Sequence, residues 1–490
     1  MIFLKIFKSQ YFWLGLIVLI GFWVRLFKID SPIADWHSWR QADTASVTRN
    51  FIKEGFNPFV THYDDSSGVA ETPLVNLNRF RFVEFPAYNM FVYPLYLLFG
   101  VNDAYHRMVS IVFSLGSIVF VFFIAKRYFG NAVAFLSSFI FALLPFNVFF
   151  SRTTLPEPTF LFFALGMVYF VDKWIGESRV SWGIWGFIFT VTAFLIKPWA
   201  IFFIPPLIYL IFKKEKKVKA IFKYLLFFIL AISPFLIWRL WILQFPEGIP
   251  ASNWLLNGDG IRLRPAFFWW LVQQRLGGEI LGVSGLVLFL IGIIVKPKNN
   301  NWFLHIWAVS LIFYLIVVAT GNVRHNYYQL ILTPVLSIFM ARGFAYLFKG
   351  NANFIPRILT IGLALFLLSL SFFFGWKYVK EFYKINNPPI IEAGKRADQI
   401  LPKEAIVVAP YNGDTAFLYQ INRPGWAVTA LPLKEMVADF GVTYYISVNK
   451  DDKTNWVKRH FYIVDETENY VIADLTKLKE KFDERKDPEP

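Results

Sequence analysis

The sequence predicts an α-helical membrane protein that crosses the bilayer about 11 times and carries a small α/β domain outside the membrane. Its residues are 56% hydrophobic and 20% aromatic, whereas a soluble domain is about 45–50% apolar. The apolar residues are gathered in runs that approach the ~20 residues a membrane-spanning helix needs. These runs shorten near the C-terminus. We therefore assign residues 1–376 to a membrane domain and 377–490 to an extramembrane domain.

Eleven stretches are apolar enough to be candidate spans. They are 11–27, 106–126, 131–150, 157–174, 181–196, 199–212, 219–243, 280–295, 302–320, 327–348 and 355–376. We divide 181–212 at Lys197-Pro198, because one long helix would move the lysines that follow to the other side of the membrane. Residues 86–100 are apolar but short. We interpret them as a segment along the outer interface, within a large external loop, 28–105.

Positive charges in the loops predict the orientation of the spans. Loops rich in lysine and arginine stay in the cytoplasm. With eleven spans, Lys126, Arg127, the lysine cluster at 213–219 and Lys349 all fall on one side. We therefore expect a protein of the cell membrane with a cytoplasmic N-terminus and an extracytoplasmic C-terminal domain. The net charge of +15 then indicates contact with anionic membrane lipids rather than with nucleic acid.

The C-terminal domain has the pattern of a small α/β fold. Residues 391–400 have the periodicity of an amphipathic helix, and 406–409 and 444–448 are typical of buried strands. A charged tail, 477–490, ends the chain.

A dense group of polar residues follows the first predicted span. Its sequence is Asp35-Trp36-His37-Ser38-Trp39-Arg40-Gln41. Charge at the edge of a membrane is costly and often functional. We interpret Asp35 or Asp43 as a general base. The donors beside them that suit a phosphate are His37, Arg40 and Gln41. The alternative is a polar cap on a membrane helix whose indoles anchor it at the interface.

The same polar group continues into a predicted helix, 40–51. Arg40, Asp43, Thr44 and Val47 recur at helical spacing, so they are expected on one face of that helix.

Two further carboxylates lie at the edges of apolar segments. Glu84 precedes Pro86, and Glu157 begins a predicted span, with Arg152 as its expected ion partner. Each carboxylate could simply stabilise a helix N-terminus. Each could instead be an active-site acid or a metal ligand, and Glu84 and Glu157 are the candidate ligands of a divalent cation. The need for a metal stays open.

Basic and aromatic residues are expected on the same outer side. Lys197 lies between two short spans, where a lysine opposes the positive-inside bias. It either binds a lipid phosphate or extends along the helix to the interface. Arg324 and His325 could grip a phosphate or diphosphate. Tyr328, close to them, belongs either to that site or to an aromatic belt.

The chain resembles the GT-C superfamily of integral-membrane glycosyltransferases. It is most similar to the branch with protein O-mannosyltransferases and the lipid A aminoarabinose transferase (glycosyltransferase families 39 and 83). Asp35 to Arg40 is similar to the acidic opening of that family's first external loop. Glu84 matches its Glu-Lys-Pro stretch, with Phe85 in place of lysine, and Glu157 matches the carboxylate of its second external loop.

One feature of that family is absent, namely its usual Asp-Glu pair. If Arg49-Asn50-Phe51 is aligned with the family, Arg40-Gln41 stands where that pair would be. Asp35 and Asp43 therefore both remain candidates for the base.

The resemblance implies an inverting transfer of a hexose or pentose from a polyprenyl phosphate on the outer face. The acceptor would be a lipid, glycan or protein. Asp35 or Asp43 would take the acceptor proton, and cationic side chains would stabilise the leaving phosphate. These are Arg40, Lys197, Arg324 and His325. No nucleotide cofactor is expected, because no Gly-rich phosphate loop follows a strand.

Two other functions fit part of the pattern. A transporter or flippase of an anionic lipid-linked sugar would need charges within the spans that face a central path. A catalytically inactive receptor would act through its C-terminal domain. Sugar transfer from a polyprenyl-phosphate donor distinguishes the enzyme from both.

Overall fold

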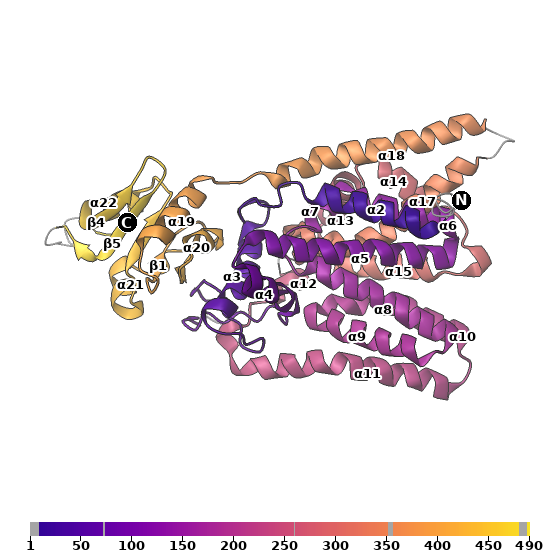
Figure 1. The fold of residues 1–490 in the computed structure, drawn as a ribbon, viewed down its shortest axis with the longest axis horizontal. Helices are drawn as coiled ribbons and strands as arrows, with labels where there is room; N and C mark the ends of the chain where they lie inside the picture. Colours follow the sequence, from indigo (N-terminus) through magenta and orange to yellow (C-terminus); the bar gives the residue numbers. More distant parts are fainter. Residues whose placement is uncertain (1–8, 72–73, 259, 351–355, 480–487) are drawn as a thin grey trace. The chain divides into compact units, whose positions relative to one another are not determined.

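The computed structural model describes residues 9–71, 74–258, 260–350, 356–479 and 488–490 (Figure 1). Contacts divide the chain into two compact units. Unit 1 comprises Met1–Ile29, Arg107–Trp241 and Ser252–Tyr383, and unit 2 comprises Asp30–His106, Ile242–Ala251 and Lys384–Pro490. Residues 480–487 of the expected tail and residue 355 of the last predicted span lie outside the described residues.

Unit 1 is built of helices, and the first residues of α5 are counted in unit 2. The helices are α2 (Gln10–Arg25), α5 (Asp103–Phe129), α6 (Asn131–Leu143), α7 (Pro145–Phe150), α8 (Glu157–Glu177), α9 (Val180–Ile196), η1 (Pro198–Phe203), α10 (Ile204–Lys214), α11 (Val218–Trp241), α12 (Asn253–Asn257), η4 (Ile261–Leu263), α13 (Pro265–Trp269), η5 (Trp270–Ile280), α14 (Ser284–Ile294), η6 (Lys298–Asn300), α15 (Phe303–Val317), α16 (Ala319–Arg324), η7 (Asn326–Leu332), α17 (Thr333–Lys349), α18 (Arg357–Val379) and η8 (Lys380–Tyr383).

Among the residues that the structure describes, five helical segments are long and apolar enough to cross a membrane. They are Asp103–Phe129, Glu157–Glu177, Ile221–Gln244, Asn326–Lys349 and Arg357–Tyr383. A sixth is added if Pro265–Ile280 and Ser284–Ile294, which meet at 108°, form one span. Most of the other predicted spans are apolar helices of 10–17 residues. The multi-pass, mainly helical architecture is therefore confirmed, whereas the number of 11 spans stays a prediction.

The span expected over 131–150 forms two helices, α6 and α7, that meet at Leu144. Pro145 has no N–H and cannot continue the backbone ladder of α6. The side-chain amide of Asn147 donates a hydrogen bond of 2.5 Å to the oxygen of Phe141 instead.

The span expected over 280–295 is also interrupted, because α14 begins only at Ser284. Gly282 lies in the bend between η5 and α14 with a φ of +57°, and a Cβ there would lie 1.9 Å from the backbone oxygen of Ser371. The bend therefore requires glycine. The turn expected at Lys197-Pro198 is confirmed, since α9 ends at Ile196 and η1 begins at Pro198.

Unit 2 contains a five-stranded sheet of order β2-β1-β3-β5-β4. Its strands are β1 (Val407–Val408), β2 (Gly425–Trp426), β3 (Tyr444–Ser447), β4 (Phe461–Glu466) and β5 (Val471–Leu478). Strand β1 is parallel to β2 and β3, with Val407 opposite Gly425 and Tyr444, and β5 is antiparallel to β3 and β4. The strands predicted over 406–409 and 444–448 are thus present.

Unit 2 also contains helices from the first part of the chain, from Ile242–Ala251 and from the C-terminal part. They are α3 (Ser38–Lys53), α4 (Ala87–Phe99), η2 (Ile242–Gln244), η3 (Pro246–Gly248), α19 (Pro389–Ile400), α20 (Ala416–Ile421), α21 (Leu433–Phe440) and α22 (Asp452–His460). The predicted helices 40–51 and 391–400 correspond to α3 and α19. In one buried cluster, Ala42 and Ala45 of α3 join Ile390 of α19 and Phe417 of α20.

Hydrogen bonds also attach the segment 64–66 to the sheet. The Gly425 N–H donates to the oxygen of Asp64 at 2.9 Å, and the Ser66 N–H donates to the oxygen of Gly425 at 2.7 Å. Residues 64–66 thus lie along β2, so segments from opposite ends of the chain form one unit.

Candidate functional site

Helix α3 is polar in sequence but buried in the structure. Its side chains from Arg40 to Phe51 are all buried, although polar groups are normally exposed. Buried polar side chains must find partners within the protein. The contacts of α3 therefore show which of the predicted residues are held in a fixed geometry.

Asp35 is oriented by Gln41 at the start of this helix. The Gln41 amide donates to Asp35 Oδ1 at 2.6 Å and to the backbone oxygen of Trp36 at 2.9 Å. Between them His37 has a φ of +57° at the N-cap position, a conformation that costs a non-glycine residue about 1–2 kcal/mol. This turn brings the Asp35 carboxylate back against α3.

Arg40 and Glu84 form a buried ion pair. Arg40 donates to Glu84 Oε1 at 2.5 Å, and the two side chains are 5% and 12% exposed. Helix α4, which follows Glu84, has Pro86 at its N-cap and no side-chain cap. Glu84 thus compensates the charge of Arg40.

Asp43 is held through both carboxylate oxygens. Thr415 donates to Oδ1 at 2.6 Å, and Arg81 donates to Oδ2 at 2.6 Å. The Asp43 side chain is 4% exposed. Neither Arg81 nor Thr415 was singled out from the sequence, since each lies in a stretch with no motif of its own. They bind Asp43 into the scaffold of unit 2.

A neighbouring contact also involves the C-terminal segment. Ser38 donates to Asp414 Oδ2 at 2.7 Å. Burial raises the pKa of Asp414, while hydrogen bonds from the Ala416 N–H and from Ser38 lower it and the negative charge of Asp43 raises it. Residues 414 and 415 therefore contact both Ser38 and Asp43 on α3.

Asp65 is a second acid of unit 2 whose environment disfavours charge. Burial raises the pKa of Asp65 from 3.8 to about 6, although hydrogen bonds from Ser67 lower it. The charge of Asp43 raises this pKa slightly and that of Arg81 lowers it. Asp65 thus gains or loses its proton near pH 6.

In unit 1, Glu157 and Lys197 form a second buried ion pair. Lys197 Nζ lies 3.1 Å from Glu157 Oε1, and the side chains are 6% and 4% exposed. Among the described residues, no donor forms a well-aligned hydrogen bond to either oxygen of Glu157. Glu157 therefore caps no N–H of α8. Its ion partner is Lys197 and not Arg152, which donates to the backbone oxygens of Phe27 and Lys28.

Aromatic contacts connect this pair to the other predicted residues of unit 1. Lys197 Nζ lies 6.0 Å from the ring centroid of Tyr328, whose ring is 5.7 Å from that of His325. Trp254 lies 5.6 Å from the His325 ring, and the Arg324 guanidinium is 5.3 Å above the Trp254 ring. Glu157, Lys197, Tyr328, His325 and Arg324 thus form one continuous cluster.

A buried network of hydrogen bonds around Glu279 adjoins this cluster. Arg275 donates to both oxygens of Glu279, at 2.5 and 2.6 Å, and Asn326 donates to Glu279 Oε2 at 3.0 Å. Arg275 also donates to the backbone oxygen of Val323 at 3.0 Å. This network fixes the segment that carries Arg324 and His325. Sequence reasoning missed it, although an Arg and a Glu four residues apart in an apolar stretch are a detectable signal.

The structure therefore places the predicted residues in two groups. Unit 2 holds Asp35, His37, Arg40, Gln41, Asp43 and Glu84, and unit 1 holds Glu157, Lys197, Arg324, His325 and Tyr328. Within the described part of the chain, no group of three or more His, Cys, Asp or Glu side chains could hold a metal ion. Both candidate metal ligands, Glu84 and Glu157, are paired with a basic side chain.

Comparison with known proteins agrees with this architecture. A family model described as dolichyl-phosphate-mannose-protein mannosyltransferase matches residues 86–238. ArnT from Cupriavidus metallidurans bound to undecaprenyl phosphate superposes with a TM-score of 0.65 and 13% identity, over 94% of this chain and 97% of that chain. This chain has the GT-C fold.

Two more solved structures with the GT-C fold are similar. Archaeal oligosaccharyltransferase AglB from Archaeoglobus fulgidus, in complex with an inhibitory peptide and a dolichol-phosphate, has a TM-score of 0.58 and 10% identity, over 95% of this chain and 74% of that chain. Arabinofuranosyltransferase AftD from Mycobacteria has a TM-score of 0.57 and 12% identity, over 95% of this chain and 41% of that chain. No curated protein matches the sequence significantly.

The predicted resemblance to the GT-C superfamily is thus confirmed. At these identities the likeness establishes the fold alone. The segment that the family model matches contains Glu157 and Lys197 and ends before Arg324.

Proposed function

We propose that this chain is a membrane glycosyltransferase. It moves a hexose or pentose from a polyprenyl-phosphate donor to a hydroxyl group of a lipid, glycan or protein on the outer face of the membrane, with inversion. The GT-C fold and the polyprenyl carriers named for ArnT and AglB support this class of reaction. The observation that carries it is the Asp35 carboxylate at the start of α3, which the Gln41 amide orients through a hydrogen bond of 2.6 Å.

Asp35 is the general base in this proposal. Asp43 receives a short hydrogen bond from Thr415 on one oxygen and from Arg81 on the other, so accepting a proton would break up the scaffold of unit 2. The Asp35 carboxylate accepts a hydrogen bond at Oδ1 from the neutral side-chain amide of Gln41, which orients it. A base must be oriented within reach of the acceptor proton and must be able to accept it.

The reaction breaks one bond and forms one. The acceptor oxygen attacks the anomeric carbon, and Asp35 takes the hydroxyl proton. The bond between the anomeric carbon and the phosphate oxygen breaks, and its electron pair leaves with the polyprenyl phosphate. The cluster of unit 1 provides the charges for that leaving group, from Lys197, Arg324 and His325. The sugar or the acceptor is bound by donors at α3, namely His37, Arg40 and Gln41.

We assign no step to a metal ion. Divalent cations prefer several oxygen ligands, whereas the carboxylates of Glu84 and Glu157 are each paired with a basic group. These two carboxylates therefore hold Arg40 and Lys197 in place for substrate.

The test is transfer by the full-length protein in nanodiscs. Donors are polyprenyl phosphates that carry either a hexose or a pentose, and the readout is release of polyprenyl phosphate with a short-chain acceptor. Asp35→Asn is expected to lower kcat by about 10²–10⁴-fold with an unchanged melting temperature. Asp43→Asn is expected to lower the melting temperature and to keep more activity than Asp35→Asn.

Other outcomes would assign the site differently. A well-folded Asp43→Asn protein without activity, beside an active Asp35→Asn protein, would make Asp43 the base. Movement of the intact donor across vesicles, without any transfer, would favour a flippase of lipid-linked sugars.

A further inference from the structure

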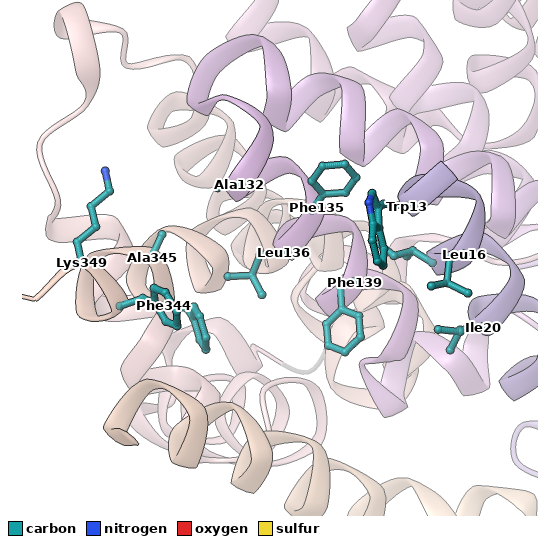
Figure 2. Close-up of a pocket in the computed structure, with 12 residues that line it drawn as sticks. Trp13, Leu16, Ile20, Ala132, Phe135, Leu136, Phe139, Phe344, Ala345 and Lys349 are labelled. Carbon is teal, nitrogen blue, oxygen red and sulfur yellow. The ribbon is translucent and has the colours of Figure 1, made fainter. Parts of the chain in front are cut away.

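An apolar groove runs along three helices of unit 1 and belongs to neither cluster of predicted site residues. Helix α6 packs against both α2 and α17, and a cavity of about 750 Å³ lies among them. Figure 2 shows Phe135, Leu136 and Phe139 of α6 between the side chains of α2 and those of α17. The volume falls within the range of about 300–1,000 Å³ that is usual for ligand sites.

The wall of this groove is apolar except at one residue. Of its twelve lining residues, only Lys349 is charged, and the rest are aliphatic or aromatic. Two aromatic side chains at its rim, Trp13 of α2 and Phe348 of α17, are 47% and 41% exposed. Exposed aromatic side chains on apolar helices are typical of the surface that a membrane protein presents to lipid. The surroundings therefore restrict the occupant to an apolar chain.

The one charged residue of the groove, Lys349, is the last residue of a helix. Helix α17 ends at Lys349, and α6 begins at Asn131. Lys126, at the end of α5, donates a hydrogen bond of 2.6 Å to Gln10, the first residue of α2. Lys349 thus lies at the C-terminal end of α17, and Lys126 contacts the first residue of α2. Basic groups next to an apolar membrane surface attract anionic lipid headgroups.

We propose that this groove binds an anionic phospholipid, with an acyl chain between α2 and α17 and the headgroup phosphate paired with Lys349. The lipid covers the exposed side of α6, a helix of only 13 residues. Such a site would hold these helices together in the membrane. It is independent of the reaction proposed above, because none of its residues belongs to either site cluster.

Two pairs of variants test the two parts of the lipid. Lys349→Gln removes the headgroup partner, and its matched control is Lys296→Gln, an exposed lysine outside the groove. Leu136→Trp fills the groove from α6, and its matched control is Leu290→Trp, at a position that is 47% exposed and lies on α14. Ala345→Leu fills the same cavity from α17 and serves if Leu136→Trp does not fold.

The experiment is native mass spectrometry of the delipidated full-length protein, titrated with phosphatidylglycerol or phosphatidylcholine. The unchanged protein is expected to bind phosphatidylglycerol at least fivefold more tightly. Lys349→Gln removes about fivefold of this preference, and Lys296→Gln leaves it intact. Leu136→Trp and Ala345→Leu lose the bound lipid, whereas Leu290→Trp keeps it.

Two results would overturn the assignment. Equal affinity for the two lipids would show that Lys349 does not bind the headgroup. An equal loss of the preference for phosphatidylglycerol in both lysine variants would show the same. If the two groove-filling variants bind the lipid as well as the unchanged protein does, the acyl chain does not lie in this groove.

Discussion

Thr415 donates a hydrogen bond of 2.6 Å to Asp43, although 372 residues separate them in the chain. The C-terminal segment is thereby joined to the helix that follows the first predicted span. We infer that this hydrogen bond helps to hold α3, the helix that also carries Arg40 and Gln41. Thr415 is thus a positioning residue in the proposed reaction.

Replacing Thr415 tests this role. Thr415→Val keeps the shape of the side chain but removes its hydroxyl, leaving a buried oxygen of Asp43 without that donor. Such a loss costs about 1–3 kcal/mol, so a lower melting temperature and a lower kcat are expected. Thr415→Ser restores the hydroxyl and should recover both. A fall in kcat with Thr415→Val that Thr415→Ser does not reverse would separate the effect from this hydrogen bond.

Variants of the Glu157–Lys197 pair can distinguish its proposed role in transfer from its contribution to stability. Lys197→Met leaves a buried carboxylate uncompensated, which typically costs about 3–5 kcal/mol. The double variant Lys197→Met with Glu157→Gln is neutral and should recover most of the stability, measured by thermal unfolding. Its transfer rate should still be about 10²–10³-fold lower than that of the unchanged protein, because the leaving phosphate no longer has the Lys197 cation beside it. Recovery of activity together with stability would mean that the pair only supports the fold.

Removal of divalent metals should leave transfer unchanged. Arg40 donates to Glu84 at 2.5 Å, so this carboxylate already has a cationic partner. The transfer rate with excess chelator is expected to stay within about twofold of the untreated rate, since the proposed chemistry uses protons and fixed charges. The control is the same assay after Mg²⁺ or Mn²⁺ is added back. Loss of activity that one of these ions restores would instead make Glu84 or Glu157 a metal ligand.

Asp65 gives unit 2 a defined dependence on pH. Burial raises its pKa from 3.8 to about 6, so the folded state binds this proton more tightly than the unfolded chain does. Between pH 4 and 6 the stability therefore falls as the pH rises. The full loss, about 3 kcal/mol at 1.36 kcal/mol for each pKa unit, is present above pH 6.

The variant Asp65→Asn removes this titration and keeps an oxygen for the Ser67 N–H. It should raise the melting temperature at pH 7 and have little effect at pH 4, as measured by thermal unfolding across that range. Asp414, whose pKa is also raised, still titrates in this variant. An unchanged pH profile in Asp65→Asn would show that Asp65 titrates near its ordinary value.

Local patterns in the sequence predicted much of the secondary structure. Helix α3 follows from the spacing of Arg40, Asp43 and Val47, and the strands β1 and β3 follow from short apolar runs. The pairing of Glu157 with Lys197 did not follow, because Arg152 is nearer in sequence and only the packing of α8 against α9 decides between them. Proximity in the chain is a poor guide to ion partners within a helical bundle.

The contacts of Asp43 were even harder to predict from the sequence. Arg81 and Thr415 lie 38 and 372 residues away from it, and neither has a periodic or motif-like neighbourhood. The interruption of the span expected over 280–295 depends likewise on the close approach of Gly282 to Ser371. Each of these features arises from long-range packing, which a single sequence does not encode in any local pattern.

The hydrogen bonds between residues 64–66 and Gly425 bear on how this protein can be recombined. They make the edge of the sheet dependent on a loop from the other end of the chain. Grafting residues 384–490 from one relative onto another would leave that edge facing a foreign loop, with unpaired N–H and C=O groups. Chimaeras should therefore exchange residues 30–106, 242–251 and 384–490 together, as a single three-segment module.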